Sequence, residues 1–319
     1  LSVGLKGAAS NAGVNRVPTG TNYAYTFGGY QSTSPSGYRS SIQRIDYSND
    51  TATAPQIASL PNAYNNRATV GNTNYAWVHP GHAPSGGSNL QRFDYYNDTA
   101  ATLTKAPIKT GHSGDDTGNE HFGYFQAAHP ETSITRLDYA SDTAPTIFRV
   151  YRSVTNQVYN GGAASNSSYG YFAGGGQNGQ AGGTTMDRID YSNDTATLTQ
   201  KGPLTSNQTY GIRATGSANF AYWGGGDGGS GPTPGNRSTV DRLDFSSDTT
   251  ATVAKGPLTR SVNRTGATGN RFFGYWTGGT NSTTVDRLDY SSDTTACATK
   301  GPLTVIVHQH SAESSRANA

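Results

Sequence analysis

Short stretches in which side chains alternate between two faces, separated by glycine-rich turns, run through most of this chain. The clearest unit lies between Lys255 and Lys300. It predicts four β-strands: small residues at 264–270, aromatic residues at 271–277, an alternating stretch at 284–290 and a threonine-rich stretch at 294–299. No segment has the 3.6-residue period of an amphipathic helix over a useful length. We therefore expect an all-β protein.

The third predicted strand carries a phrase, Arg-x-Asp followed by an aromatic residue, that occurs six times along the chain. Steps of 48, 44, 52, 54 and 45 residues separate the arginines. A period of roughly 40–50 residues with four strands in each unit is typical of the blades of a β-propeller. We expect a six-bladed β-propeller with four-stranded antiparallel blades, built as a single domain by residues 1–319. The repeated pairs are Arg44 and Asp46, Arg92 and Asp94, Arg136 and Asp138, Arg188 and Asp190, Arg242 and Asp244, and Arg287 and Asp289.

The arginine and the aspartate of each phrase lie on the same face of their strand, because strand side chains alternate with a period of two. We interpret the pair as structural, forming a salt bridge or a bond to the backbone of the neighbouring blade. Fifteen of the 21 acidic residues occupy repeated positions of this kind. That regularity weakens a catalytic interpretation of the carboxylates.

The two ends of the chain predict strands that overlap around one blade. Residues 1–7 resemble a fourth strand that leads into the Lys-Gly link, within a terminal segment of residues 1–10. In the segment 300–319, the same link is followed by a strand at 305–308. One end closes the ring, as propellers do to remove a free sheet edge. The other end is left to pack outside or to pair with another molecule, and the sequence does not decide between the two ends.

The repeat resembles the kelch repeat, which has a double glycine, then a strand with an acidic residue, Arg, an aromatic residue and Asp, and then a polar turn. The match is best at Thr239–Phe245, with three glycines, Gly224–Gly226, before it. This chain lacks the tryptophan that kelch blades usually carry in the fourth strand. The sequence Tyr-Ser-Asn-Asp-Thr-Ala, which begins at Tyr47 and again at Tyr191, is also similar to repeats in proteins of marine bacteriophage virions. The resemblance implies a kelch-like propeller.

The composition limits the expected partners and the expected location of the protein. The formal net charge is +2, so nucleic acid is not an expected partner. No stretch of about 18 apolar residues is present, so we expect no insertion into a membrane. Cys297 is the only cysteine, which excludes an intrachain disulfide. Lysine and glutamate are scarce, whereas Thr, Asn, Gly and Tyr are abundant, a balance that favours an extracellular or virion location.

The spacing Asp-x-Ser-x-Asp, as in Asp46, Ser48 and Asp50, raises calcium as a candidate cofactor. It matches the first three ligand positions of a calcium loop but lacks the glycine and the glutamate that follow in that loop. Asp and Ser also close turns by bonding to their own backbone, and we favour that interpretation. We therefore expect no cofactor, with calcium as the alternative.

Blades two and three depart from the repeat, and they hold the candidate binding residues. Histidines and acidic residues gather where the other blades have glycines, and a divergent sector of a regular ring is where a functional site is expected. No nucleophile elbow, zinc-protease motif or phosphate-binding loop is present, so we expect no catalytic residues and no metal site. The candidates are Trp77, His79, His82, His112, Asp115, Glu120, His121 and His129.

These features favour a non-enzymatic recognition propeller that binds a cell-surface glycan or protein through variable loops on a rigid ring. The loops at 177–183 and 227–238 are the longest and are expected contact tips. Two alternatives remain open. One is a subunit of an extracellular filament or phage tail, assembled through a terminal strand or with other virion proteins. The other is a polysaccharide hydrolase or lyase that uses the histidines and acids of blades two and three.

Overall fold

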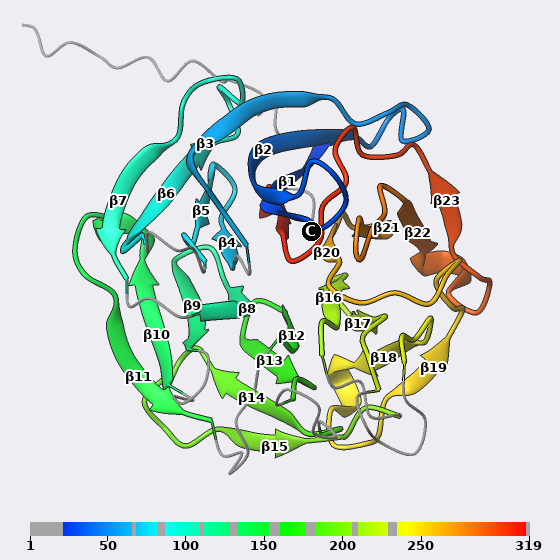
Figure 1. Cartoon of the computed structure of the whole chain (residues 1–319). Helices are drawn as coiled ribbons and strands as arrows, with labels where there is room; N and C mark the ends of the chain where they lie inside the picture. Colours follow the sequence, from blue (N-terminus) through cyan, green and yellow to red (C-terminus); the bar gives the residue numbers. More distant parts are fainter. Residues whose placement is uncertain are drawn as a thin grey trace, which may run out of the picture.

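The chain forms a six-bladed β-propeller of four-stranded antiparallel sheets, which confirms the fold expected from the repeats (Figure 1). The computed structural model describes residues 22–65, 68–81, 87–108, 112–127, 133–152, 160–176, 183–205, 210–228 and 235–316, with only the backbone of 112–115. No α-helix occurs in these ranges, only short 3-10 turns such as η3 (Phe245–Ser247). None of the described helices is long and apolar enough to cross a membrane.

The strands of each blade run outward from the axis in chain order, except in blade one, where the innermost strand comes from the end of the described chain. Blade one contains β24 (Ser311–Ser314), β1 (Tyr23–Gln31), β2 (Gly37–Asp46) and β3 (Gln56–Tyr64), and blade two contains β4 (Thr69–Gly71), β5 (Tyr75–Val78), β6 (Asn89–Asp94) and β7 (Leu103–Pro107). Blade three contains β8 (His112–Gly118), β9 (Phe122–Ala127), β10 (Ser133–Asp138) and β11 (Ile147–Tyr151), and blade four contains β12 (Gly162–Ser165), β13 (Tyr169–Ala173), β14 (Met186–Asp190) and β15 (Thr199–Lys201). Blade five contains β16 (Arg213–Gly216), β17 (Phe220–Gly224), β18 (Val240–Asp244) and β19 (Val253–Lys255), and blade six contains β20 (Gly266–Gly269), β21 (Phe273–Thr277), β22 (Val285–Asp289) and β23 (Ala298–Lys300).

The innermost strands are built from small residues because space is tight near the axis. A Cβ on Gly269 would lie 2.6 Å from the carbonyl oxygen of Phe273 and 2.7 Å from the hydroxyl of Thr215 of the preceding blade. The fourth strand of blade six is shorter than the predicted 294–299, since Tyr290–Ser292 form a 3-10 turn and the strand begins only at Ala298.

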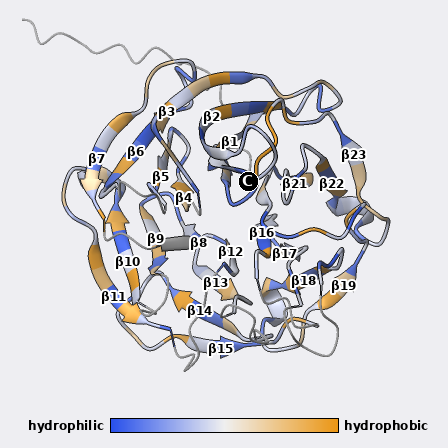
Figure 2. Cartoon of the chain, in the orientation of Figure 1, coloured by the Kyte–Doolittle hydropathy of each residue, from blue (hydrophilic) through white to orange (hydrophobic). Residues whose placement is uncertain are grey.

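The hydrophobic core is divided into six clusters, each at a junction between two neighbouring blades. At the junction of blades four and five, Tyr171 and Met186 pack with Ile212, Trp223 and Leu243. Figure 2 shows hydrophobic positions spread over all the blades, as this arrangement requires. The apolar packing of the protein therefore lies at the junctions between blades.

A repeated ionic contact joins the blades. The arginine of each Arg-x-Asp phrase binds an aspartate in the turn between the third and fourth strands of the next blade, at 2.7 to 2.9 Å. It does not bind the aspartate of its own phrase, which lies two residues away on the same face of the strand. The pairs are Arg44–Asp98, Arg92–Asp142, Arg136–Asp194, Arg188–Asp248, Arg242–Asp293 and Arg287–Asp50.

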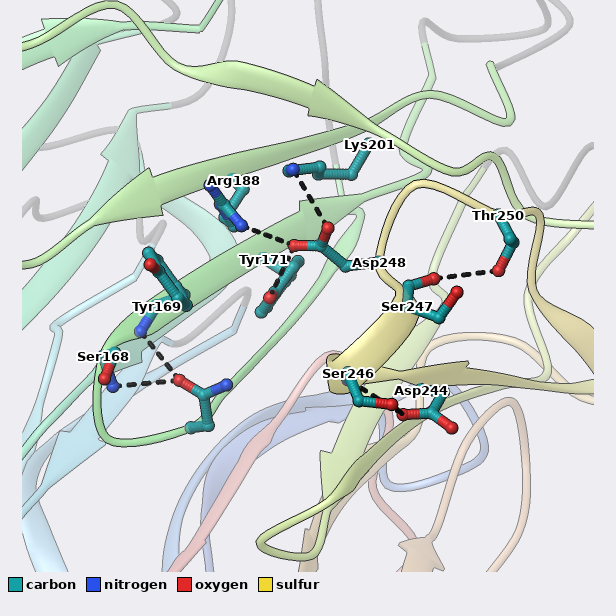
Figure 3. A network of polar contacts seen from close by, with 11 residues as sticks. Ser168, Tyr169, Tyr171, Arg188, Lys201, Asp244, Ser246, Ser247, Asp248 and Thr250 are labelled. Carbon is teal, nitrogen blue, oxygen red and sulfur yellow. Dashed lines mark hydrogen bonds and ion pairs between the residues drawn. The ribbon is translucent and has the colours of Figure 1, made fainter.

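Figure 3 shows this contact between blades four and five. Asp248 accepts from Arg188 at 2.7 Å and from the Tyr171 hydroxyl at 3.0 Å, and it pairs with Lys201 at 2.9 Å. Burial alone would raise the pKa of Asp248, but the bonds from Lys201, Tyr171 and Arg188 hold that pKa below its ordinary value. We call this arrangement of one aspartate with cationic and aromatic donors of the preceding blade the aspartate latch.

The aspartate of each Arg-x-Asp phrase has a different role from the aspartate of the latch. Asp244 accepts bonds from the backbone N–H of Ser246 at 2.9 Å and from its hydroxyl at 2.6 Å, which closes the turn (Figure 3). The same turn bond is made by Asp46 with Ser48 and by Asp289 with Ser291. The Asp-x-Ser-x-Asp spacing thus divides its two carboxylates: the first closes a turn, and the second belongs to the aspartate latch.

The ring is closed by the C-terminal strand. β24 pairs antiparallel with β1, from Ala24 opposite Ser314 to Phe27 opposite Ser311. The prediction of a strand at 305–308 was wrong: only His308 makes a bridge, to Tyr30, and the strand comes later. Gln309, between the bridge at His308 and β24, adopts a left-handed conformation (φ 52°). The predicted strand within residues 1–10 lies outside the described residues.

Candidate functional site

A cavity of about 600 Å³ lies on the axis of the ring and is lined by the innermost strands of all six blades. Its lining includes the turns between first and second strands, at Asn119–His121 and at residues 166–167 and 217–218. The cavity therefore opens on the face of the ring that carries these turns. Small-molecule sites usually occupy about 300–1,000 Å³.

The turns at the mouth of the cavity are held rigid by their own side chains. Asn119 accepts bonds from the backbone N–H groups of His121 and Phe122 at 2.8 and 2.9 Å. Asn72, Asn166 and Asn270 make the same pair of bonds in their blades. These Asx turns fix the backbone around the mouth, so a ligand would meet a preformed rim.

The closing strand places charged side chains inside the cavity. Arg316 donates from Nε to the carbonyl oxygen of Gly71 at 2.6 Å, and the Ser315 hydroxyl donates to the carbonyl oxygen of Thr73 at 2.7 Å. Glu120 reaches the same turn of blade two and accepts from the Thr73 N–H and hydroxyl, both at 3.1 Å. Arg316, Glu120 and Glu313 thus gather around residues 71–73, and we call them the charged cluster.

Glu313 occupies the position that is threonine in blades three, five and six. There the hydroxyls of Thr117 and Thr215 contact a tyrosine hydroxyl of the next blade, at 2.9 and 3.3 Å. The Glu313 side chain is partly buried beside Gly71 and Tyr95. Burial raises its pKa to about 7, although Arg316 lowers it. This carboxyl therefore changes charge near neutral pH.

Replacing Glu313 with glutamine should change how stability depends on pH. The folded chain holds the Glu313 proton more tightly than the unfolded chain, whose glutamate has a pKa near 4.5. The stabilising effect of the protonated carboxyl is therefore full below that value and is lost as the pH rises through about 7. We expect Glu313→Gln to melt at nearly the wild-type temperature at about pH 4 and a few degrees above it at about pH 8. A melting-temperature difference that stays constant over this range would contradict the assignment.

The opposite end of the axis is crossed by residues 308–310. Gln309 receives a bond from Asn65, donates to the Tyr210 hydroxyl and binds the carbonyl oxygen of Arg264 through its backbone. His308 and His310 are buried, and burial lowers their pKa values to about 4 and about 3. Both histidines are therefore neutral at physiological pH, and they belong to the segment that crosses the axis.

The predicted site residues are divided between the core and the cavity. Trp77 is buried, donates from Nε1 to Asp142 at 3.0 Å and stacks on Tyr139, so it takes the place of the tyrosine in the aspartate latch. His79 is fully buried and accepts from the Gly81 N–H at 2.8 Å. Glu120 and His121 are exposed at the cavity. His112 and Asp115 lie on β8 with only their backbone described, and His82 and His129 lie outside the described residues.

Sequence reasoning missed Glu313 and Arg316. A signal was present: Ser311–Ser314 aligns with the innermost strands Arg213–Gly216 and Gly266–Gly269, and glutamate replaces the threonine of those strands. The expected contact tips at 177–183 and 227–238 are described only at 183, 227–228 and 235–238. Among the described residues, no cluster of three or more His, Cys, Asp and Glu is suited to hold a metal ion.

Comparison with known proteins supports the architecture. A solved structure titled "Structure of YjhT" matches with a TM-score of 0.60, over 77% of this chain and 86% of that chain, at 9% sequence identity. This likeness shows the fold alone. No protein-family model matches the chain, and no curated protein matches it. The site must therefore be interpreted from its own residues.

Proposed function

We propose that this chain is a non-enzymatic recognition propeller, displayed outside a cell or on a virion, that binds a cell-surface glycan in its central cavity. The observation that carries the proposal is the cavity of about 600 Å³ with hydroxyl, carboxyl and guanidinium groups on a rigid rim. Sugars are recognised by such groups when a rigid scaffold fixes their positions. The aspartates of the repeat are occupied by turns and latches, so we place recognition at the cavity rather than at the repeat.

We also propose that the repeats are kelch-like and related to repeats of bacteriophage virion proteins. The double glycines support this relation, because both residues adopt left-handed conformations: Gly225 and Gly226 have φ of 72° and 95°, and Gly278 and Gly279 have φ of 60° and 98°. Glycine adopts this conformation readily and other residues rarely do. The pattern is therefore maintained by backbone geometry at the start of the loop between second and third strands.

A second candidate function, polysaccharide hydrolysis, is favoured by one observation. Glu313 and Glu120 both line the cavity, and the pKa of Glu313 is raised by burial to about 7. A carboxyl with a raised pKa beside a second carboxylate is the arrangement that glycosidases use. It ranks lower because Glu120 is engaged by Thr73. The filament alternative depends on the strand predicted within residues 1–10, since β24 pairs with β1 of its own ring.

The proposal is tested by binding of the whole protein to a glycan array, followed by calorimetry on the glycans that bind. We expect the double variant Glu120→Ala, His121→Ala to bind its glycan about tenfold more weakly, which corresponds to about 1.4 kcal/mol. Thr199→Ala is the matched control, because Thr199 is exposed on the outer strand β15. Equal binding by both variants would place recognition elsewhere.

The same glycans are then incubated with the protein and their reducing ends are counted. Release of reducing ends by the wild type, abolished by Glu313→Gln, would replace the recognition proposal with the hydrolase. Fibres that grow with protein concentration and disappear on deletion of residues 1–7 would favour the filament.

A further inference from the structure

Arg316 is an arginine inside a cavity with most of its donors unused. It is partly buried, and its one side-chain hydrogen bond to the described part of the chain runs from Nε to Gly71. It makes no ion pair with the acidic residues described. By contrast, the arginines of the aspartate latch each bind a carboxylate at 2.7 to 2.9 Å. The terminal nitrogens of Arg316 are therefore available to a ligand.

The surroundings keep this guanidinium charged. Burial by itself would lower its pKa, but nearby Tyr139, Glu313, Tyr191 and Glu120 raise it above the ordinary value. Arg213, the other arginine of the cavity, donates to the carbonyl oxygens of Gly161 and Ile212 at 2.7 and 2.8 Å and is occupied by them. Arg316 is thus the cavity cation with unused donors in the described part of the chain.

A planar guanidinium with two free terminal nitrogens matches a carboxylate, which it binds through two parallel hydrogen bonds. Around Arg316, Glu120 and Glu313 offer acceptors for hydroxyl groups, and the Asx turns hold the rim. A ligand that satisfies this set carries one carboxylate beside several hydroxyls.

We propose that the central cavity binds an acidic sugar, a uronate, whose carboxylate is held by the guanidinium of Arg316. This inference rests on the proposed glycan recognition and names its ligand class. The carboxylate is bound by the terminal nitrogens of Arg316, and the sugar hydroxyls donate to Glu120 and Glu313.

The test is calorimetric titration of the whole protein with glucuronate, glucuronate methyl ester and glucose. We expect the wild type to bind glucuronate at least tenfold more tightly than the two neutral sugars. Arg316→Ala should lose this preference, and Arg316→Lys should keep part of it, because lysine retains the charge without the planar fork. Arg271→Ala is the matched control, since Arg271 is exposed on the same face, in the turn between β20 and β21, and should bind like the wild type.

Thermal melts of each variant show whether it folds, and a variant that does not fold is replaced by Arg316→Gln. Equal affinity of the wild type for glucuronate and its methyl ester would overturn the assignment. So would equal losses in Arg316→Ala and Arg271→Ala. If the array finds a neutral glycan whose binding survives Arg316→Ala, glycan recognition stands and the uronate inference fails. If no glycan binds at all, both fail.

Discussion

Asp248→Ala is expected to destabilise the propeller by about 3 kcal/mol, the lower end of the effect of removing one partner from a buried ion pair, because Arg188 is partly exposed. The substitution leaves Arg188, Lys201 and the Tyr171 hydroxyl without their shared acceptor, and the latch carboxylate is 8% exposed. Because these three groups belong to blade four and Asp248 to blade five, the loss acts on the junction rather than on one sheet. The measurement is unfolding in urea followed by fluorescence, with the free energy extrapolated to water.

Asp244→Ala is the matched control, four residues away in the same turn. Asp244 only closes its turn through Ser246, so its removal should destabilise the protein by about 0.5–2 kcal/mol, as loss of a cap does. Equal effects of the two substitutions would mean that the latch adds nothing beyond turn formation. The latch should also weaken in acid: the pKa of Asp248 is held low, so its contribution is present above the ordinary pKa and is lost as the pH falls through the lowered value.

Removal of residues 311–319 should lower the melting temperature by about 10 °C or more, at roughly 2–4 °C for each kcal/mol lost. The truncation deletes β24, leaves β1 as a free edge and removes one wall of the cavity. It also removes the contacts of Ser315 and Arg316 with blade two. Differential scanning calorimetry measures the shift, and small-angle scattering should show a larger radius of gyration.

A synthetic peptide of residues 311–319 provides the control for this truncation. Added to the truncated protein, it should restore most of the lost melting temperature, whereas a peptide of the same composition in scrambled order should not. An unchanged melting temperature of the truncated chain would show that the ring does not depend on its closing strand. Failure of both peptides to raise a lowered melting temperature would show that the closing strand cannot be replaced by a separate peptide.

The architecture was predictable because a blade is a local object. The turn residues, the double glycine and the alternation in Thr284–Tyr290 all lie within one unit; the turn and the alternation recur in all six blades, and the double glycine recurs in four. The partners across a junction were not predictable, since Arg188 meets Asp248 at a separation of 60 residues while Asp190 stands two residues away. Alternation shows which face a side chain occupies and not which neighbour it meets there.

The candidate site was harder to predict for a related reason. Departure from the repeat singled out Trp77 and His79, but both pack in the junction between blades two and three. Glu120 and His121 do lie at the cavity. Glu313 and Arg316 were missed because the cavity is assembled from six strands that are far apart in sequence, and because the expected terminal strand lay a few residues too early. A site on an axis of symmetry leaves little trace in any single repeat.

The aspartate latch recurs at the junction where the two ends of the ring meet. Arg287 and Lys300 bind Asp50 as Arg188 and Lys201 bind Asp248. The chemistry of the ring therefore does not distinguish a first blade from a last one. A circularly permuted chain, with its ends joined and a new start cut into a loop between second and third strands, keeps every latch. The position of the termini is thus a free choice, open to fusion of a partner at whichever blade presents it best.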